Sequence, residues 1–344
     1  MNPLSIKQIF RTAAISVVLV AASSAGAQTV LGVSTFATGT AVNATSPDSI
    51  ALWKNSVWVS YSNGADSTGL SGSSTVVQYK LNGKVRHIYS IPGYVDGLKV
   101  DPRSGLVWAM QNQDGNSTLT LINPKAGAAS KPISYAVTSG ARGYDDVAFR
   151  FNQAFVSYTN PTGPTDPTIQ LVQNGSNPVV VTPILLMGAT GTNLATGHAN
   201  QPTAQSDPDS LKLTPSGDLM LSSDADSQLI FVGQPGTTKQ SVSFLTLLDP
   251  STGLAVSGVD DAVFATADKG SFYLSDTHNN RILKIDAANL AIGSLYASLG
   301  GLNEFATVDI HTGLVTALVS NLNAPHGLEF SPNTEDSQGD NTNH

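Results

Sequence analysis

The chain has no cysteine, and this absence excludes the small extracellular scaffolds that disulfide bonds hold together. Charged residues are also scarce, at 12% of 344 residues. After residue 27, no stretch is apolar for long enough to span a bilayer, and no segment keeps the apolar period of a useful helix. Gly, Ser, Thr, Asn and Val are abundant instead, a mixture that suits many short strands joined by tight turns.

Residues 1–27 have the organisation of a secretory signal peptide. Lys7 and Arg11 form its positive start, Ala13–Ala22 is apolar, and Ala25-Gly-Ala27 has the small residues of a cleavage site. The alternative, a retained membrane anchor, is disfavoured because the apolar stretch is well below the roughly 20 residues of a spanning helix. We therefore expect a secreted or periplasmic protein with no membrane span after signal removal, a folded domain over 28–332 and a disordered polar tail over 333–344.

Acidic residues dominate the chain that remains after the signal peptide. Without Lys7 and Arg11, 15 Lys and Arg stand against 25 Asp and Glu, a net charge of −10. Such a surface repels nucleic acid and anionic lipid, and it favours cations or neutral ligands. We expect a monomer with no nucleic-acid partner; its small-molecule ligand or protein partner is not named by the sequence.

Six short openings recur along the chain. Each has an acid or a histidine, then a small or acidic residue, then an apolar one. The intervals between them are 48, 49, 64, 51 and 66 residues, so three lie near 50 and two carry insertions, one of them visible in the polar stretches Asn160–Pro167 and Gly188–Asp207. The openings are Asp48-Ser-Ile50, Asp96-Gly-Leu98, Asp145-Asp-Val147, Asp209-Ser-Leu211, Asp260-Asp-Ala262 and His326-Gly-Leu328.

The residues between the openings alternate apolar and polar and are interrupted by turn residues. Gly258–Ile285 is interpreted as one whole unit, with an opening strand, a second strand at Phe272–Ser275 and a third at Ile282–Ile285. Antiparallel sheets of about four strands at this spacing predict an all-β fold, a six-bladed β-propeller, closed by pairing of Val30–Phe36 with a C-terminal strand. A horseshoe solenoid is the alternative, but its repeats are normally shorter and carry a leucine-asparagine ladder that is absent here.

Two motifs resemble known repeat families. Asp276-Thr-His-Asn-Asn-Arg-Ile-Leu-Lys-Ile285 is similar to the third-strand signature of NHL repeats, and Val95-Asp-Gly-Leu98 and Pro325-His-Gly-Leu328 are similar to strand openings of the SMP-30/gluconolactonase-like propellers. The resemblance implies a divalent cation at the channel mouth, held in that family by a Glu, Asn side chains and an Asp. The openings here have neither Glu nor Asn, so lactonase chemistry does not follow from the resemblance.

The inner strands of a propeller open toward the axis at one end, so residues about 50 positions apart converge. Crowded carboxylates raise one another's pKa unless a cation neutralises them, and ligands that are all oxygen favour Ca²⁺. The alternative is structural, because Asp before Gly, Ser or Asp commonly hydrogen-bonds to its own turn. The predicted metal ligands are Asp48, Asp96, Asp145, Asp209 and Asp260, with Asp146 and Asp261 as further candidates.

His326 is the predicted catalytic residue, because neighbouring carboxylates would raise its pKa and let it act as a general base or acid. The alternative role is a hydrogen-bonded residue at a strand opening. Ser275, Asp276 and His278 do not form a triad, since neighbours on a strand point to opposite faces.

Two functions stay open. One is a binding or interaction protein whose acidic mouth holds Ca²⁺ and a small ligand; the other is a metal-dependent, lactonase-like or ester hydrolase. The tryptophans, Trp53, Trp58 and Trp108, are interpreted as packing between blades rather than as a ligand platform.

Overall fold

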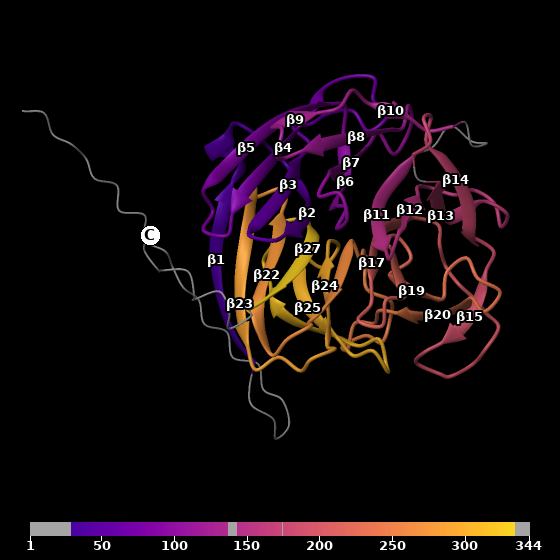
Figure 1. The fold of residues 1–344 in the computed structure, drawn as a ribbon. Helices are drawn as coiled ribbons and strands as arrows, with labels where there is room; N and C mark the ends of the chain where they lie inside the picture. Colours follow the sequence, from indigo (N-terminus) through magenta and orange to yellow (C-terminus); the bar gives the residue numbers. More distant parts are fainter. Residues whose placement is uncertain (1–28, 137–142, 174, 334–344) are drawn as a thin grey trace, which may run out of the picture.

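The computed structural model describes residues 29–136, 143–173 and 175–333. The predicted signal peptide and residues 334–344 of the predicted tail lie outside these ranges. Figure 1 shows antiparallel sheets arranged around a central axis, and the expected all-β, six-bladed propeller is confirmed. Within the described ranges the single helical element is the short 3-10 helix η1 (Gly39–Val42), and no helix there has the length and hydropathy of a membrane span.

Blades 1 to 3 follow the chain in order, each from an inner strand at the axis to the outer edge. Blade 1 comprises β2 (Pro47–Trp53), β3 (Ser56–Tyr61), β4 (Ser73–Lys80) and β5 (Val85–Pro92). Blade 2 comprises β6 (Val95–Val100), β7 (Val107–Gln111) and β8 (Thr118–Asn123), and both β9 (Ala128–Ala129) and β10 (Ile133–Ser134) pair with β8. Blade 3 comprises β11 (Tyr144–Arg150), β12 (Gln153–Tyr158), β13 (Pro167–Gln173) and β14 (Val180–Leu186).

Blade 4 carries the first insertion as additional strands. Its own strands are β17 (Pro208–Leu213), β18 (Leu219–Ser223), β19 (Gln228–Gly233) and β20 (Ser241–Thr246). β15 (Thr190–Asn193) pairs in parallel with β20, and β16 (Gln201–Pro202) pairs with β15. The stretch that was expected to be only a polar loop therefore widens the outer edge of this blade.

Blades 5 and 6 interlock, and here the predicted repeat unit is wrong. Blade 5 comprises β21 (Asp261–Phe264), β24 (Leu295–Leu299), β25 (Glu304–Val308) and β26 (Val315–Val319). The hairpin of β22 (Lys269–Asp276) and β23 (Arg281–Ala288) follows β21 in sequence but pairs with β27 (Pro325–Pro332) in blade 6. The second long interval between openings thus holds a hairpin that belongs to the next blade.

The N-terminal strand closes the ring. β1 (Val30–Thr38) pairs with β23 as the outer strand of blade 6, as predicted, and Figure 1 shows the two side by side. Phe36 packs edge-on against Tyr79 of blade 1 and Tyr273 of blade 6, with ring centroids 5.7 and 5.0 Å away. Blade 6 is therefore built from segments at both ends and in the middle of the domain, which joins these distant parts of the chain.

The core is divided among the blade interfaces. Six clusters of buried apolar side chains each combine residues from two adjacent blades. Trp58 is 1% exposed in the cluster between blades 1 and 2, and Trp108 packs against Phe149 between blades 2 and 3. Because apolar residues fill the interfaces, the channel at the axis is left to polar and charged side chains.

Candidate metal site at the channel mouth

The inner strands of blades 1 to 4 carry a β-bulge at their openings. Pairing of β2 with β3 passes from Pro47 directly to Ile50, and the same two-residue gap occurs in β6, β11 and β17. A bulge turns two consecutive side chains to one side, whereas a regular strand alternates them. Both members of an opening pair, such as Asp145 with Asp146 and Asp209 with Ser210, therefore line the channel.

Glycine at the second opening position allows neighbouring inner strands to approach closely. A Cβ at Gly97 would lie 2.1 Å from the Asp145 carbonyl oxygen, and one at Gly327 would lie 2.6 Å from the Asp48 carbonyl oxygen. These contacts join blade 2 to blade 3 and blade 6 to blade 1. The openings are thus positioned by the openings of the next blade as well as by their own strands.

Buried serines on second strands also hold the openings. Ser222 of β18 donates to the Asp260 carbonyl oxygen at 2.7 Å, and Ser275 of β22 donates to the Asp48 carbonyl oxygen. Ser157 accepts from the Asp146 backbone amide at 2.9 Å, and Ser298 accepts from that of Asp261 at 3.1 Å. Each serine ends a run of apolar residues, a repeated signal in the sequence that our sequence analysis did not use.

The openings enclose a strongly acidic cavity of about 230 Å³. Among the described residues, His326 and Lys99 are its cationic side chains. The aspartates that line it are Asp48, Asp96, Asp114, Asp145, Asp146, Asp207, Asp209, Asp224, Asp260 and Asp261. This imbalance favours a cation or a ligand that donates hydrogen bonds.

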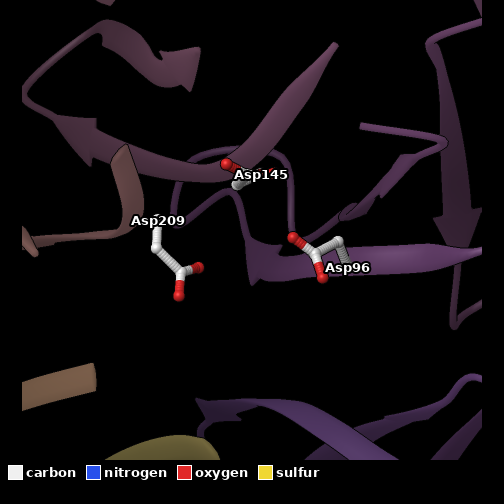
Figure 2. Close-up of side chains that lie close together, drawn as sticks. All are labelled: Asp96, Asp145 and Asp209. Atoms are coloured by element: carbon white, nitrogen blue, oxygen red, sulfur yellow. The ribbon is translucent and has the colours of Figure 1, made fainter. Parts of the chain in front are cut away.

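Three of the five predicted metal ligands form a cluster. Figure 2 shows Asp96, Asp145 and Asp209 pointing toward one another, and one carboxylate oxygen of each lies within 4.8 Å of the others. Two oxygens that share one Ca²⁺ can be up to about 5.2 Å apart, since each Ca–O distance is about 2.3–2.6 Å. Asp145 is 4% exposed, and its Oδ1 has no hydrogen-bond partner among the described residues. The donor set and this unpartnered oxygen fit a hard divalent cation.

Burial and mutual repulsion raise the pKa of these carboxyl groups. Burial is the largest cause at Asp96, and the charges of Asp48 and Asp145 raise its pKa further. The pKa of Asp209 is also raised well above its ordinary value, by burial and by the charge of Asp260. Burial also raises the pKa of Asp145 well above its ordinary value, and the charges of Asp207 and Asp114 add to this effect. A cation bound among these carboxyl groups would relieve the repulsion.

The other half of the ring satisfies its charges by pairing. His326 Nδ1 lies 3.1 Å from Asp260 Oδ1 and 3.2 Å from Asp48 Oδ1. The charge of Asp260 is the largest cause that raises the pKa of His326, to about 10, so the imidazolium form is held at neutral pH. Tyr94 donates to Asp48 Oδ2 at 2.8 Å. Asp48 and Asp260 therefore already have cationic or hydrogen-bonding partners.

A charged plug closes the channel below the mouth. It consists of Asp146, Asp261, Lys99, Lys212 and Glu329. Lys212 Nζ lies 2.8 Å from Asp261 Oδ2 and 3.1 Å from Glu329 Oε1, and Lys99 Nζ lies 3.4 Å from Asp146 Oδ2 and 3.1 Å from Glu329 Oε1. Burial alone would raise the pKa of Glu329, but the two lysines lower it below its ordinary value. A separate cavity of about 360 Å³ opens beneath the plug.

The six predicted openings lie at the starts of the six inner strands, but the division of the ring into two halves was not predicted. Asp146 and Asp261, which were candidates for the ring, lie in the plug instead. The side-chain hydrogen bonds of Asp48 join it to Tyr94, directly before β6, and to His326 of β27 rather than to its own turn. Lys99, Lys212 and Glu329 were missed, although each is a charged residue three positions after an opening.

Comparisons with known proteins agree with the fold. No family model matches the chain, and no curated protein matches it. A protein of unknown function from Bacteroides thetaiotaomicron has a similar structure, with 13% identity over 87% of this chain and 70% of that one, and a TM-score of 0.50.

Two further structures have named activities. The periplasmic gluconolactonase of Pseudomonas aeruginosa is 10% identical over 83% of this chain and 88% of that one, with a TM-score of 0.49. A streptogramin B lyase is 13% identical over 86% and 90%, with a TM-score of 0.48. At these identities and TM-scores the two likenesses carry no conclusion about activity, which has to be argued from the site.

Proposed function

We propose that this protein is a secreted or periplasmic binding protein whose channel mouth holds one Ca²⁺ through Asp96, Asp145 and Asp209. The observation that carries the proposal is the convergence of three carboxylates from three blades, one of them with a buried oxygen that has no hydrogen-bond partner among the described residues. Leaving such an oxygen unpaired costs about 1–3 kcal/mol, and a cation would remove that cost.

Ca²⁺ is favoured over a transition metal because the cluster offers oxygen alone. Imidazole and thiolate ligands select zinc and copper. The chain has no cysteine, and the nearest imidazole, that of His326, is engaged by Asp48 and Asp260. Extracellular calcium modules bind with dissociation constants of about 10⁻⁴–10⁻³ M, which suits a site outside the cell.

The ligand that we propose for the mouth is small and either neutral or cationic. Asp114, Asp207 and Asp224 line the cavity beyond the three-carboxylate cluster. Neighbouring carboxylates raise the pKa of Asp207 and Asp224 in addition to the effect of burial. A bound Ca²⁺ would offset part of this charge and offer an oxygen-binding position, and the remaining acids would accept hydrogen bonds from hydroxyl or ammonium groups.

Thermal unfolding of the mature protein tests the metal site. After exhaustive chelation, added Ca²⁺ should raise the melting temperature, because a ligand that binds only the native state stabilises it by about 2.7 kcal/mol at 100 times its Kd. Metal analysis of the untreated protein should find one ion per chain. Affinity should increase with pH, since Ca²⁺ competes with protons at carboxyl groups whose pKa is raised.

Asp145→Asn should abolish the calcium-dependent shift, and Asp268→Asn is the matched control. Asp268 is exposed and lies away from the cavity. An equal calcium response in both variants, or no response in the unmodified protein, would sink the proposal and leave these aspartates with a structural role.

A second candidate function is a metal-dependent lactone or ester hydrolysis. The observation that favours it is the raised pKa of Asp224 and Asp260 beside the cluster, since a general base works best with a pKa near neutral pH. The catalytic role of His326 stays a prediction, and its raised pKa favours a proton donor over a base. Loss of hydrolysis in His326→Ala at unchanged melting temperature would support an enzyme; a calcium-loaded protein inactive on a lactone and ester panel would contradict it.

A further inference from the structure

A second cavity lies at the opposite end of the propeller from the acidic mouth. β2 begins at the mouth with Pro47 and ends at Trp53, roughly 20 Å away at about 3.3 Å per residue. Between blades 1 and 2 at that end is a groove of about 510 Å³, within the range of roughly 300–1,000 Å³ that is typical of small-molecule sites. We call it the basic groove, and Trp53, Lys54, Gln78, Arg86, Arg103 and Lys125 line it.

The charge of the basic groove is opposite to that of the protein. The chain has 25 acidic and 17 basic residues, yet none of the described residues that line the groove is Asp or Glu. Arg103 has a carboxylate nearby, with Nε 3.4 Å from Asp101 Oδ1. For Arg86 and Lys125, no carboxylate of the described residues lies within salt-bridge distance. Cations that lack partners in an acidic protein can neutralise an anionic ligand without first losing an ion pair.

A buried amide lies at the base of the groove. Gln78 is 5% exposed, and its Nε2 donates to Ser56 Oγ at 2.9 Å. Its Oε1 has no partner among the residues that the structure describes, and neither does Nε1 of Trp58, which lies opposite Gln78 on the neighbouring strand. Buried polar atoms are normally paired. The acceptor of a side chain that lines the groove is therefore left unpaired among the described residues.

Trp53 gives the groove an aromatic wall. Its ring is half-buried, and Lys54 Nζ lies 5.5 Å from the ring centroid. Unlike Trp58, which is enclosed by the apolar cluster, Trp53 is shared between packing and this groove. The interpretation of all three tryptophans as inter-blade packing is therefore incomplete for Trp53.

We propose that the basic groove binds an anionic ligand of sugar size. Its carboxylate, phosphate or sulfate contacts Arg86, Arg103 and Lys125, its ring lies near Trp53, and a hydroxyl or amide group hydrogen-bonds to Gln78. Guanidinium groups match the planar or tetrahedral oxygens of such anions through paired hydrogen bonds. This site is separate from the mouth, and its charge selects ligands that the mouth repels.

Tryptophan fluorescence offers a direct test, because Trp53 and Trp58 are two of the three tryptophans and lie at or behind the groove. The mature protein is titrated at low ionic strength with glucuronate, glucose 6-phosphate and glucosamine 6-sulfate, and with glucose as the uncharged probe. We expect saturable quenching by at least one anion and none by glucose. The anion that binds most tightly identifies the charged group.

The double variant Arg86→Gln/Lys125→Gln should weaken that binding by at least about tenfold, since hydrogen bonds to charged groups contribute about 1.5–3 kcal/mol. Lys239→Gln is the matched control, an exposed lysine of the turn between β19 and β20. Both variants should keep the melting temperature of the parent. Absence of saturable quenching by all three anions, or equal affinity in the double and control variants, would overturn the proposal.

Discussion

The mouth and the plug lie on the same inner strands, but their buried charges are balanced differently. In the plug, two lysines and three acids pair at 2.8–3.4 Å, and the set is close to neutral. In the mouth, five aspartates and one histidine meet, and the half that contains Asp96, Asp145 and Asp209 has no cationic partner among the residues that the structure describes. The plug thus neutralises its charges with internal ion pairs, whereas the acidic cluster directly above it stays uncompensated. Such a cluster is typical of a site that takes its counter-charge from a ligand.

The largest expected effect comes from breaking the plug. Lys212→Met should lower the free energy of unfolding by about 3–5 kcal/mol, because it leaves Asp261 buried without its lysine and leaves Glu329 with Lys99 alone. Urea denaturation measures the loss. Lys239→Met, at an exposed position, should change stability by less than about 0.5 kcal/mol. Similar small losses in both variants would show that the plug is solvated rather than closed.

His326 tests the paired half of the mouth. Its folded pKa of about 10 exceeds the ordinary 6.5, so its stabilising effect is fully present below pH 6.5 and is lost as pH rises to about 10. His326→Gln should therefore cost about 1.5 kcal/mol near pH 6, the value of a hydrogen bond to a charged group, and less at each higher pH. Denaturation curves across this range measure the difference. A cost that stays constant with pH would mean that the imidazole is neutral.

The smallest expected effect on stability is an increase rather than a loss. In the chelated protein, Asp209→Asn should increase the free energy of unfolding by up to about 1 kcal/mol at neutral pH, because it removes a charge that is repelled by Asp260 and Asp96. The same variant should lose the stabilisation by Ca²⁺. Calorimetry with and without Ca²⁺ shows both effects. If the chelated variant were less stable than the parent, Asp209 would have a structural role like the acids of the plug.

The positions of the six openings could be predicted because every inner strand repeats the same short pattern near the same spacing. The interlocking of blades 5 and 6 could not be predicted, because the sequence of the β22–β23 hairpin does not show whether it pairs with β21 or with β27. Its partner is decided by long-range pairing, with Leu274 opposite Leu328 and Phe272 opposite Phe330. The division of the ring also escaped prediction, because it depends on which carboxylates reach His326 across the channel.

The sequence by itself determined an all-β chain whose openings must converge. Strand alternation, turn residues and a repeat period near 50 residues can all be recognised in the sequence without knowledge of long-range contacts. Tertiary structure alone decided which charges meet. Bulges direct both Asp145 and Asp146 into the channel, the close approach at Gly97 sets one opening against the next, and side chains more than 100 positions apart, such as Lys212 and Glu329, become ion pairs. Such pairing depends on distances across the ring, and no local pattern in the chain records those distances.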